Sequence, residues 1–146
     1  MSATPRRVTR AQYEILASFR YALRVFLRFS EDAAKDVGLT PQQHQALLAI
    51  KGFPGRDSVT VGELAERLQI RHHSAVGLID RLTVLNLLDR IPSKEDRRNV
   101  SLVLTPHGEA VLEKLSAAHQ VQLERIGPQI TDLLHRLGGT RNREED

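Results

Sequence analysis

Two short stretches of the chain gather side chains that bind nucleic acids well. The first opens a predicted helix and supplies Arg71, His72, His73 and Ser74, with Arg81 further along the same helix. The second lies on a predicted turn and supplies Lys94, Arg97 and Arg98. Histidine and serine donate hydrogen bonds to bases and phosphates, and arginine is attracted by the negative potential of a narrow minor groove. Taken by itself, the second stretch could equally be a solvated loop of mixed charge.

A pair of short helices would hold the first stretch. The pattern predicts one helix over 60–68, and Thr60 with Glu63 forms a capping box at its start. A tight turn at 69–70 leads to a second helix, over about 71–87. Its apolar spacing turns the following residues toward the core: Val76, Ile79, Leu82 and either Val84 or Leu85.

A β-hairpin follows and would carry the second stretch at its tip. Its strands are predicted at 89–91 and 100–104, and its tip spans 93–98. Asp96 would orient Arg98 rather than touch DNA. A helix that can enter a major groove, beside a cationic ribbon that can reach the neighbouring groove, is the layout of a winged-helix DNA-binding protein. The predicted fold is therefore mainly α with a small β-hairpin wing, and the winged helix-turn-helix spans 41–105.

A long helix is predicted over 11–37, before this module. Its apolar stripe consists of Ile15, Phe19, Leu23, Phe26 and Leu27. Gly38 would end it, and Thr40 with Pro41 and Gln43 would cap the next helix. The stripe of so long a helix must be buried against something beyond a compact central core, and a second subunit is a natural candidate.

The chain after the hairpin is predicted to form one long and one short helix. Thr105-Pro106 starts the long helix, Gly127-Pro128 breaks it, and the short helix ends at Gly138-Gly139. Residues 1–10 are expected to form a flexible basic arm, and 139–146 a disordered tail.

Composition excludes several classes of function. The chain has 146 residues, a formal net charge of +3 and no cysteine, which excludes disulfides and thiolate metal sites. No apolar run approaches the roughly 20 residues of a membrane span, and the N-terminus lacks the apolar core of a secretory signal, so a cytoplasmic protein is expected. Catalytic motifs and paired carboxylates are absent from the sequence, so we expect neither an enzyme nor a cofactor.

Histidine and glycine positions leave alternatives open. His72 and His73 point about 100° apart on a helix, so they cannot easily share a metal ion. A metal site assembled on folding from His44, His107 and a carboxylate has no supporting ligand spacing but stays an alternative. Gly77 either allows a close approach of DNA or another helix, or is tolerated at a cost of roughly 0.5–1 kcal/mol relative to alanine.

Five short motifs follow one another in a fixed order. They are Leu64-Ala65-Glu66-Arg67-Leu68, Arg71-His72-His73-Ser74-Ala75-Val76, Leu78-Ile79-Asp80-Arg81-Leu82, Asp96-Arg97-Arg98 and Leu104-Thr105-Pro106-His107-Gly108. Together they resemble the MarR family of bacterial transcriptional regulators, and the Asp-x-Arg and Leu-Thr-x-x-Gly sequences are the most specific. The order of the predicted helices also agrees, so the resemblance covers about 11–137.

The resemblance implies a homodimer that binds double-stranded DNA. Residues 11–37 and 106–138 would be dimerisation helices, and each winged helix would read half of a pseudo-palindromic operator. By the motif match, Arg98 is the wing-tip arginine and Asp96 is its partner. The base-reading turn would be 72–74.

The resemblance also implies regulation by a small ligand. Many family members are repressors that a phenolic or anionic ligand releases from DNA. Phe19, Phe26 and His44 could line such a pocket, although core packing is the better explanation for them. The chain departs from the family pattern in two places: Asn86 replaces a glycine before the wing, and no cysteine is present for thiol oxidation. Asn tolerates the left-handed conformation, so the turn should survive.

Two rival hypotheses remain. A winged helix that has lost DNA binding could serve as a protein–protein interaction module, although such a module would have no need of three cations on its wing. A metal-dependent regulator would change its DNA affinity when a chelator is added.

Overall fold

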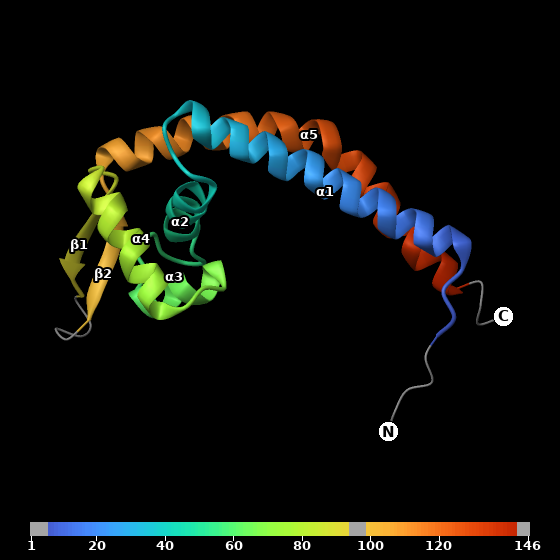
Figure 1. The fold of residues 1–146 in the computed structure, drawn as a ribbon, viewed down its shortest axis with the longest axis horizontal. Helices are drawn as coiled ribbons and strands as arrows, with labels where there is room; N and C mark the ends of the chain where they lie inside the picture. Colours follow the sequence, from blue (N-terminus) through green and yellow to red (C-terminus); the bar gives the residue numbers. More distant parts are fainter. Residues whose placement is uncertain (1–5, 94–98, 143–146) are drawn as a thin grey trace, which may run out of the picture. The chain divides into compact units, whose positions relative to one another are not determined.

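The computed structural model describes residues 6–93 and 99–142, and beyond Gly139 it describes only the backbone. Helices and strands follow in the order α1 (Arg10–Asp36), α2 (Pro41–Lys51), α3 (Val61–Leu68), α4 (His72–Val84), β1 (Leu88–Pro92), β2 (Val100–Leu104) and α5 (Pro106–Asn142) (Figure 1). This order confirms the predicted, mainly α fold with a small antiparallel hairpin. In the described part of the chain, no helix contains an apolar stretch long enough to cross a membrane.

The chain divides into two compact units. The helical-pair unit comprises the described parts of 1–30 and 119–146, and the central unit comprises 31–118. Both boundaries lie inside long helices, α1 and α5. The sequence had suggested boundaries at the ends of the predicted helices, near 37 and 106, but the last turn of α1 and the first turns of α5 pack into the central core.

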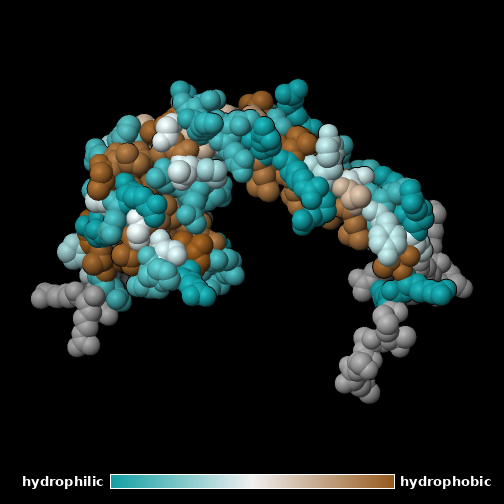
Figure 2. Space-filling model, viewed as in Figure 1, coloured by the Kyte–Doolittle hydropathy of each residue, from teal (hydrophilic) through white to brown (hydrophobic). Residues whose placement is uncertain are grey.

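In the helical-pair unit, α1 and α5 lie side by side (Figure 1). Ile15, Ala22 and Leu133 are buried in this unit. Several large apolar side chains on the same two helices are exposed: Tyr13, Leu16, Tyr21, Val25, Leu27, Val121, Leu123 and Leu134. Figure 2 shows hydrophobic surface between hydrophilic residues along these helices. One copy of the chain therefore buries only part of the apolar surface of this unit.

Helix α5 continues through both of its predicted interruptions. The break at Gly127-Pro128, the separate last helix and the end at Gly138-Gly139 were therefore wrong predictions. A proline usually clashes with the Cβ of the residue before it when that residue is helical, but Gly127 has no Cβ. The apolar spacing also continues across the proline, with Ile126, Ile130, Leu133 and Leu137 at least partly buried. Of the predicted disordered tail, 139–142 are helical, and the rest lies outside the described residues.

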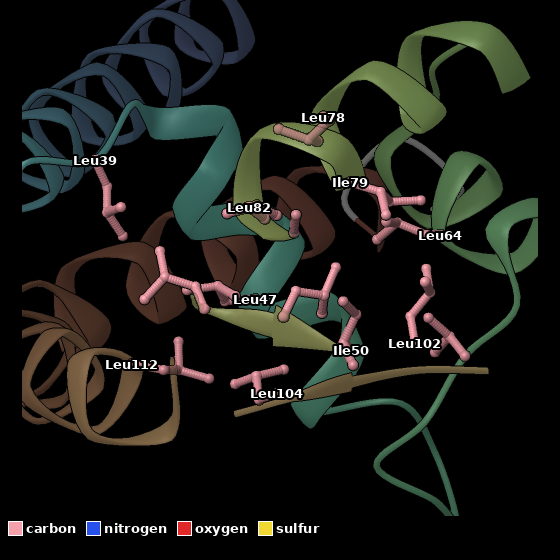
Figure 3. Close-up of a cluster of buried hydrophobic side chains, with 14 of the residues drawn as sticks. Leu39, Leu47, Ile50, Leu64, Leu78, Ile79, Leu82, Leu102, Leu104 and Leu112 are labelled. Atoms are coloured by element: carbon pink, nitrogen blue, oxygen red, sulfur yellow. The ribbon is translucent and has the colours of Figure 1, made fainter. Parts of the chain in front are cut away.

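The central unit is built around one apolar core (Figure 3). Helices α2, α3 and α4, both strands and the start of α5 all contribute to it. Its most deeply buried members are Leu47, Ile50, Val59, Leu64, Ile79, Leu82, Leu88 and Leu102. Burying a side chain of this size contributes roughly 1.5–3 kcal/mol, so this core holds the short helices and the hairpin together.

Helices α2 and α3 begin at the predicted capping boxes. The Thr40 hydroxyl accepts a bond from the Gln43 N–H (3.1 Å), and the Gln43 side chain accepts one from the Thr40 N–H (3.0 Å). Thr60 and Glu63 repeat this arrangement at 3.2 and 2.9 Å. Gly38 ends α1 with φ +79, the left-handed conformation for which glycine was expected. These three local predictions are confirmed.

The end of α4 differs from the prediction. The helix stops at Val84 instead of Leu87, and Asn86 takes the left-handed conformation at φ 57. This confirms the turn expected of Asn86, which starts the path into β1. The buried face of α4 consists of Ala75, Leu78, Ile79 and Leu82.

The core roles predicted for Val76, Val84 and Leu85 were wrong, because these side chains are 37%, 85% and 46% exposed. Ile79 and Leu82 are the members of the predicted stripe that do face the core. The other buried residues of α4 are Ala75 and Leu78, and each precedes by one residue a position that was predicted to face the core. After the turn, Leu87 and Leu88 are buried in the core.

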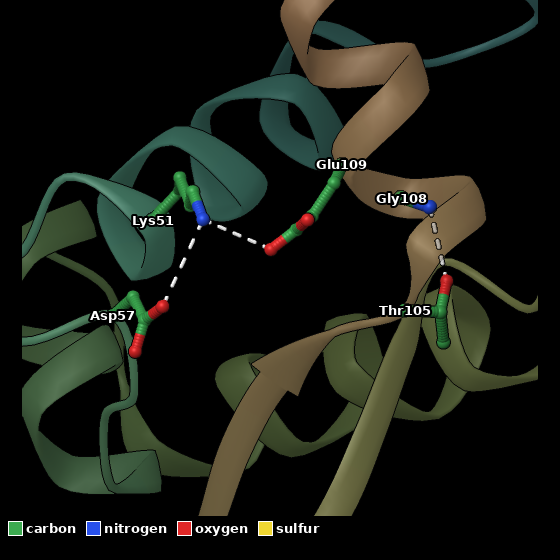
Figure 4. Close-up of polar contacts among 5 residues, drawn as sticks. All are labelled: Lys51, Asp57, Thr105, Gly108 and Glu109. Carbon is green, nitrogen blue, oxygen red and sulfur yellow. Dashed lines mark hydrogen bonds and ion pairs between the residues drawn. The ribbon is translucent and has the colours of Figure 1, made fainter.

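Backbone hydrogen bonds join the hairpin to the loop before α3, and Thr105 caps the start of α5. Val59 and Leu102 exchange two backbone hydrogen bonds, at 3.2 and 2.8 Å, which joins the loop before α3 to β2. At the start of α5, the Thr105 hydroxyl accepts a bond from the Gly108 N–H at 2.9 Å (Figure 4). A Cβ at Gly108 would overlap the carbonyl oxygen of Leu87, so only glycine fits there.

Candidate nucleic-acid interface

The residues predicted to read DNA surround the start of α4. Arg71, His72, His73 and Ser74 are all exposed. Successive residues of a helix are about 100° apart, and the outward face opposite the buried stripe consists of His73, Gly77, Asp80 and Val84. Val76 flanks this face on one side, and Ser74 and Arg81 flank it on the other. The structure therefore brings His73, Ser74 and Arg81 onto one exposed surface of α4, whereas His72 is exposed outside this surface.

The start of α4 lacks the cap that its neighbours have. Arg71 is the N-cap residue, but its side chain makes no capping hydrogen bond. The first turn of α4 contains no acidic residue. The amide groups of a helix N-terminus attract anions, and a cation beside them adds to this attraction. The amide groups and the Arg71 side chain at this end of α4 are therefore suited to bind a phosphate group.

Arg81 lies along the surface of α4. Its Nε donates a hydrogen bond to the carbonyl oxygen of Gly77 at 3.1 Å. The nearest described atom to a Cβ added at Gly77 is a guanidinium nitrogen of Arg81, at 3.4 Å. Within the described residues, no second helix presses on Gly77. Of the explanations left open by the sequence, an approach of DNA or simple tolerance therefore remains.

An ion pair connects α4 to the hairpin. Asp80 on α4 accepts a hydrogen bond from the guanidinium of Arg90 on β1. Both side chains are partly exposed, so the pair contributes little to stability. Sequence reasoning missed this pair, because ten residues and a change from helix to strand separate its members.

The wing tip lies outside the described residues. This applies to Lys94, Asp96, Arg97 and Arg98, whose DNA-binding and orienting roles stay predictions. The base of the wing is described: Pro92 pairs with Val100, and the Ser93 N–H donates to the carbonyl oxygen of Asn99 at 3.0 Å. The predicted strands of the hairpin are confirmed.

A second cationic group lies beside the helix-turn-helix. The guanidinium of Arg56 stands 4.4 Å from the centroid of the Phe53 ring, and that of Arg67 stands 4.9 Å from it. Glu63 pairs with Arg56. Phe53 thus holds two arginines near the turn between α3 and α4. No spacing in the sequence indicates their shared aromatic partner.

The capping box of α3 favours the ionised form of the Glu63 side chain. Burial disfavours its ionised form, but hydrogen bonds from the Thr60 backbone, from Arg56 and from the Thr60 side chain outweigh that effect and lower the pKa of Glu63. Elsewhere in the central unit, Lys51 pairs with Glu109 at 2.9 Å and Asp57 at 3.7 Å (Figure 4). The hydrogen bond and charge of Glu109 raise the pKa of Lys51 above its ordinary value. Its charge is balanced within the protein and is a poor candidate for a DNA contact.

The three residues suggested for a ligand pocket are not members of one unit. Phe26 belongs to the helical-pair unit, where its ring meets that of His119 edge-on at 5.8 Å, and Phe19 is half-buried on the same helix. His44 is buried in the central unit. The pocket therefore stays a prediction.

The central unit has a different hollow. A groove of about 370 Å³ between α2 and α4 is lined by Gln43, Asp80, Arg81, Val84 and Leu85. As for metals, the described residues contain no group of three His, Asp or Glu side chains that could hold an ion.

Comparison with known proteins identifies the central region. Residues 37–99 match the model of the MarR family. The chain is 32% identical over 88 residues to the HTH-type transcriptional repressor MdtR of Bacillus subtilis, a match that covers 60% of this chain and 55% of MdtR. The chain thus spans about half the length of this relative.

Solved structures agree over nearly the whole chain. AbsC, a MarR family transcriptional regulator from Streptomyces coelicolor, superposes with a TM-score of 0.72 at 22% identity over 97% of each chain. A mutant of S. aureus MepR bound to an oligodeoxyribonucleotide superposes with a TM-score of 0.64 at 17% identity, over 95% of this chain and 96% of MepR. At these identities the likeness concerns the fold. Residues 37–99 are thus similar to the MarR family of transcriptional regulators, and the chain has the winged-helix fold of solved MarR family structures.

Proposed function

We propose that the protein is a homodimeric repressor that binds a pseudo-palindromic operator in double-stranded DNA. The observation that carries this proposal is the open start of α4. It is exposed and uncapped, and basic and hydrogen-bonding side chains surround it. In a helix-turn-helix, this is the end of the recognition helix that contacts base edges. MdtR is a transcriptional repressor, and the MepR mutant is bound to an oligodeoxyribonucleotide, which supports the same role for this chain.

The homodimer is proposed from the helical-pair unit. Eight large apolar side chains on its two helices are exposed in one copy of the chain: Tyr13, Leu16, Tyr21, Val25, Leu27, Val121, Leu123 and Leu134. Burial of such a surface against a second copy would supply the driving force for association. A dimer also fits the operator, because two recognition helices related by a two-fold axis read two half-sites about one helical turn apart.

Release by a small phenolic or anionic ligand, and a cytoplasmic location, belong to the same proposal. The predicted wing contacts of Lys94, Arg97 and Arg98 also stay within it. The ligand pocket has no assigned residues in this proposal, because Phe19 and Phe26 belong to one unit and His44 to the other.

The test is a selection of bound sequences from random duplex DNA by the purified protein, at near-physiological salt. Enrichment of an inverted repeat with half-sites about one helical turn apart is the expected result. Binding without enrichment would indicate a non-specific DNA-binding protein. No binding would favour the rival hypothesis of a protein–protein interaction module.

The wing is tested on the selected operator with Arg98→Ala. Loss of a groove contact should weaken binding by about 1–3 kcal/mol and leave dimerisation unchanged. Arg125→Ala is the matched control, because Arg125 is exposed on α5, in the helical-pair unit. Titration of labelled operator measures the affinity, and sedimentation measures the dimer. Unchanged affinity in the Arg98 variant would contradict the assignment of the wing.

A further inference from the structure

Packing within the central unit does not explain the valine at position 76. It is 37% exposed and is not part of the core cluster of the central unit. A β-branched residue also favours helix formation less than alanine does. Among the exposed and half-buried residues of α4 from His72 to Arg81, all of which the structure describes, Val76 is the one aliphatic side chain. The exposed apolar side chain of Val76 is therefore available for contact with a binding partner outside the chain.

The surface around Val76 leaves room for such a partner. Gly77 has no side chain, and nothing but the guanidinium of Arg81 comes within 4 Å of the place that a Cβ would take. Asp80, one turn further along the same surface, is paired with Arg90. Its charge is therefore partly balanced and repels DNA less. A flat group, such as the edge of a base, could therefore approach the surface of α4 closely at Gly77, beside Val76.

The chemistry of the partner follows from the groove that α4 would enter. In the major groove, thymine is the base that presents a methyl group, and apolar side chains recognise thymine by contact with it. Resting on the proposed function, we propose that Val76 reads the 5-methyl group of a thymine in each operator half-site, and that Gly77 lets this base edge approach. The inference deepens the DNA-binding proposal by assigning one base to one side chain.

The experiment compares thymine with deoxyuridine, which differs by that methyl group alone. Each thymine in one half-site of the selected operator is replaced by deoxyuridine in turn, and the affinity of wild type and of Val76→Ala is measured for each duplex. For wild type, one replacement should weaken binding about fourfold, the equivalent of roughly 0.8 kcal/mol for one buried CH₂ group. For Val76→Ala the same replacement should have almost no effect, because the methyl group has lost its partner.

Val84→Ala is the matched control. Val84 has the same side chain on the same helix and is 85% exposed, but it lies about 12 Å further along the axis, away from the base-reading end. This variant should keep the full fourfold penalty for deoxyuridine. Circular dichroism checks that both variants keep the helix content of wild type, which is expected because alanine is the better helix former.

The outcomes separate this inference from the proposed function. A wild type that binds its operator, with a deoxyuridine penalty that persists in Val76→Ala, overturns the role of Val76 alone. A selected half-site without thymine does the same. A wild type that binds no DNA overturns the proposed function and this inference together. A penalty that disappears in Val76→Ala and persists in Val84→Ala supports both.

Discussion

Helices α3 and α4 follow each other in the chain but begin in opposite ways. At the start of α3, Thr60 and Glu63 satisfy each other's backbone donors, and the carboxylate of Glu63 suits the positive end of the helix. At the start of α4, a cation takes the N-cap position and makes no capping hydrogen bond. The first helix is closed by its own side chains, whereas the second is open to an anion from outside. The difference indicates that α3 is built for stability and that α4 gives up stability at the proposed site of DNA binding.

The largest effect is expected at another closed helix start, that of α5. Gly108→Ala should lower the free energy of unfolding by about 1–3 kcal/mol, because the new Cβ would overlap the backbone of Leu87 and something must shift. Urea unfolding measures this loss. The control is Gly62→Ala at the start of α3, where the nearest atom would lie at 4.0 Å and a gain of about 0.5–1 kcal/mol is expected. Equal behaviour of the two variants would contradict the close approach of Leu87.

The closed start of α3 itself is tested by Thr60→Ala. This variant removes the hydroxyl that accepts the Glu63 N–H, and the free energy of unfolding should fall by about 0.5–2 kcal/mol. Thr40→Ala removes the same bond from the capping box of α2 and should cost a similar amount. DNA affinity per folded molecule should be unchanged in both variants. A loss of affinity in Thr60→Ala alone would mean that α3 also has a part in binding.

The open start of α4 should respond with the opposite sign. Arg71→Ser supplies a side chain that can cap the helix, and the free energy of unfolding should rise by up to about 1 kcal/mol. The same variant loses a cation near the phosphates, so operator binding should weaken and the log–log slope against salt should fall by about 0.9. Arg56→Ser is a control cation near the same turn, because it is already paired with Glu63. Stability that rises without any change in the slope would contradict a phosphate contact of Arg71.

How far the sequence predicts the molecule depends on how local each feature is. The two capping boxes, the Gly38 and Asn86 turns and the strands of the hairpin involve residues close in sequence, and all were predicted correctly. The wrong predictions concern α4 and α5, where packing overrides local preference. Gly127-Pro128 is a helix-breaking pair, yet α5 continues through it. A missing Cβ and an unbroken apolar stripe outweigh the proline.

The same limit applies to the candidate site. The exposed start of α4 follows from a local helix pattern, so its residues could be named in advance. The pairing of Asp80 with Arg90 and the stacking of Arg67 on Phe53 join separate elements, and no spacing rule indicates them. The helical spacing predicts a core position for Val76, because an apolar residue at such a spacing normally lies in the core. Its exposure makes it a candidate for recognition of a base.

The smallest effect should come from the charge of Glu63, tested by pH. Because its pKa is lower in the folded protein than its ordinary value, the ionised form favours folding. This stabilisation is fully present above the ordinary glutamate pKa of about 4.3, and it is lost as the pH falls through the lower pKa of the folded state. Glu63→Gln keeps a side chain that can complete the capping box but has no charge. Wild type should therefore be more stable than Glu63→Gln at neutral pH, and the difference should shrink in acid.

Urea unfolding of both proteins across this pH range provides the measurement. Glu66→Gln is the control, because it removes a charge from the same helix outside the capping box. The same comparison can be made in the background of Arg71→Ser, where α4 also has a cap. If the difference in unfolding free energy between wild type and Glu63→Gln stays constant with pH, the charge of Glu63 does not stabilise the start of α3. Its contrast with α4 would then rest on the hydrogen bonds of Thr60 alone, since those bonds remain when Glu63 is neutral.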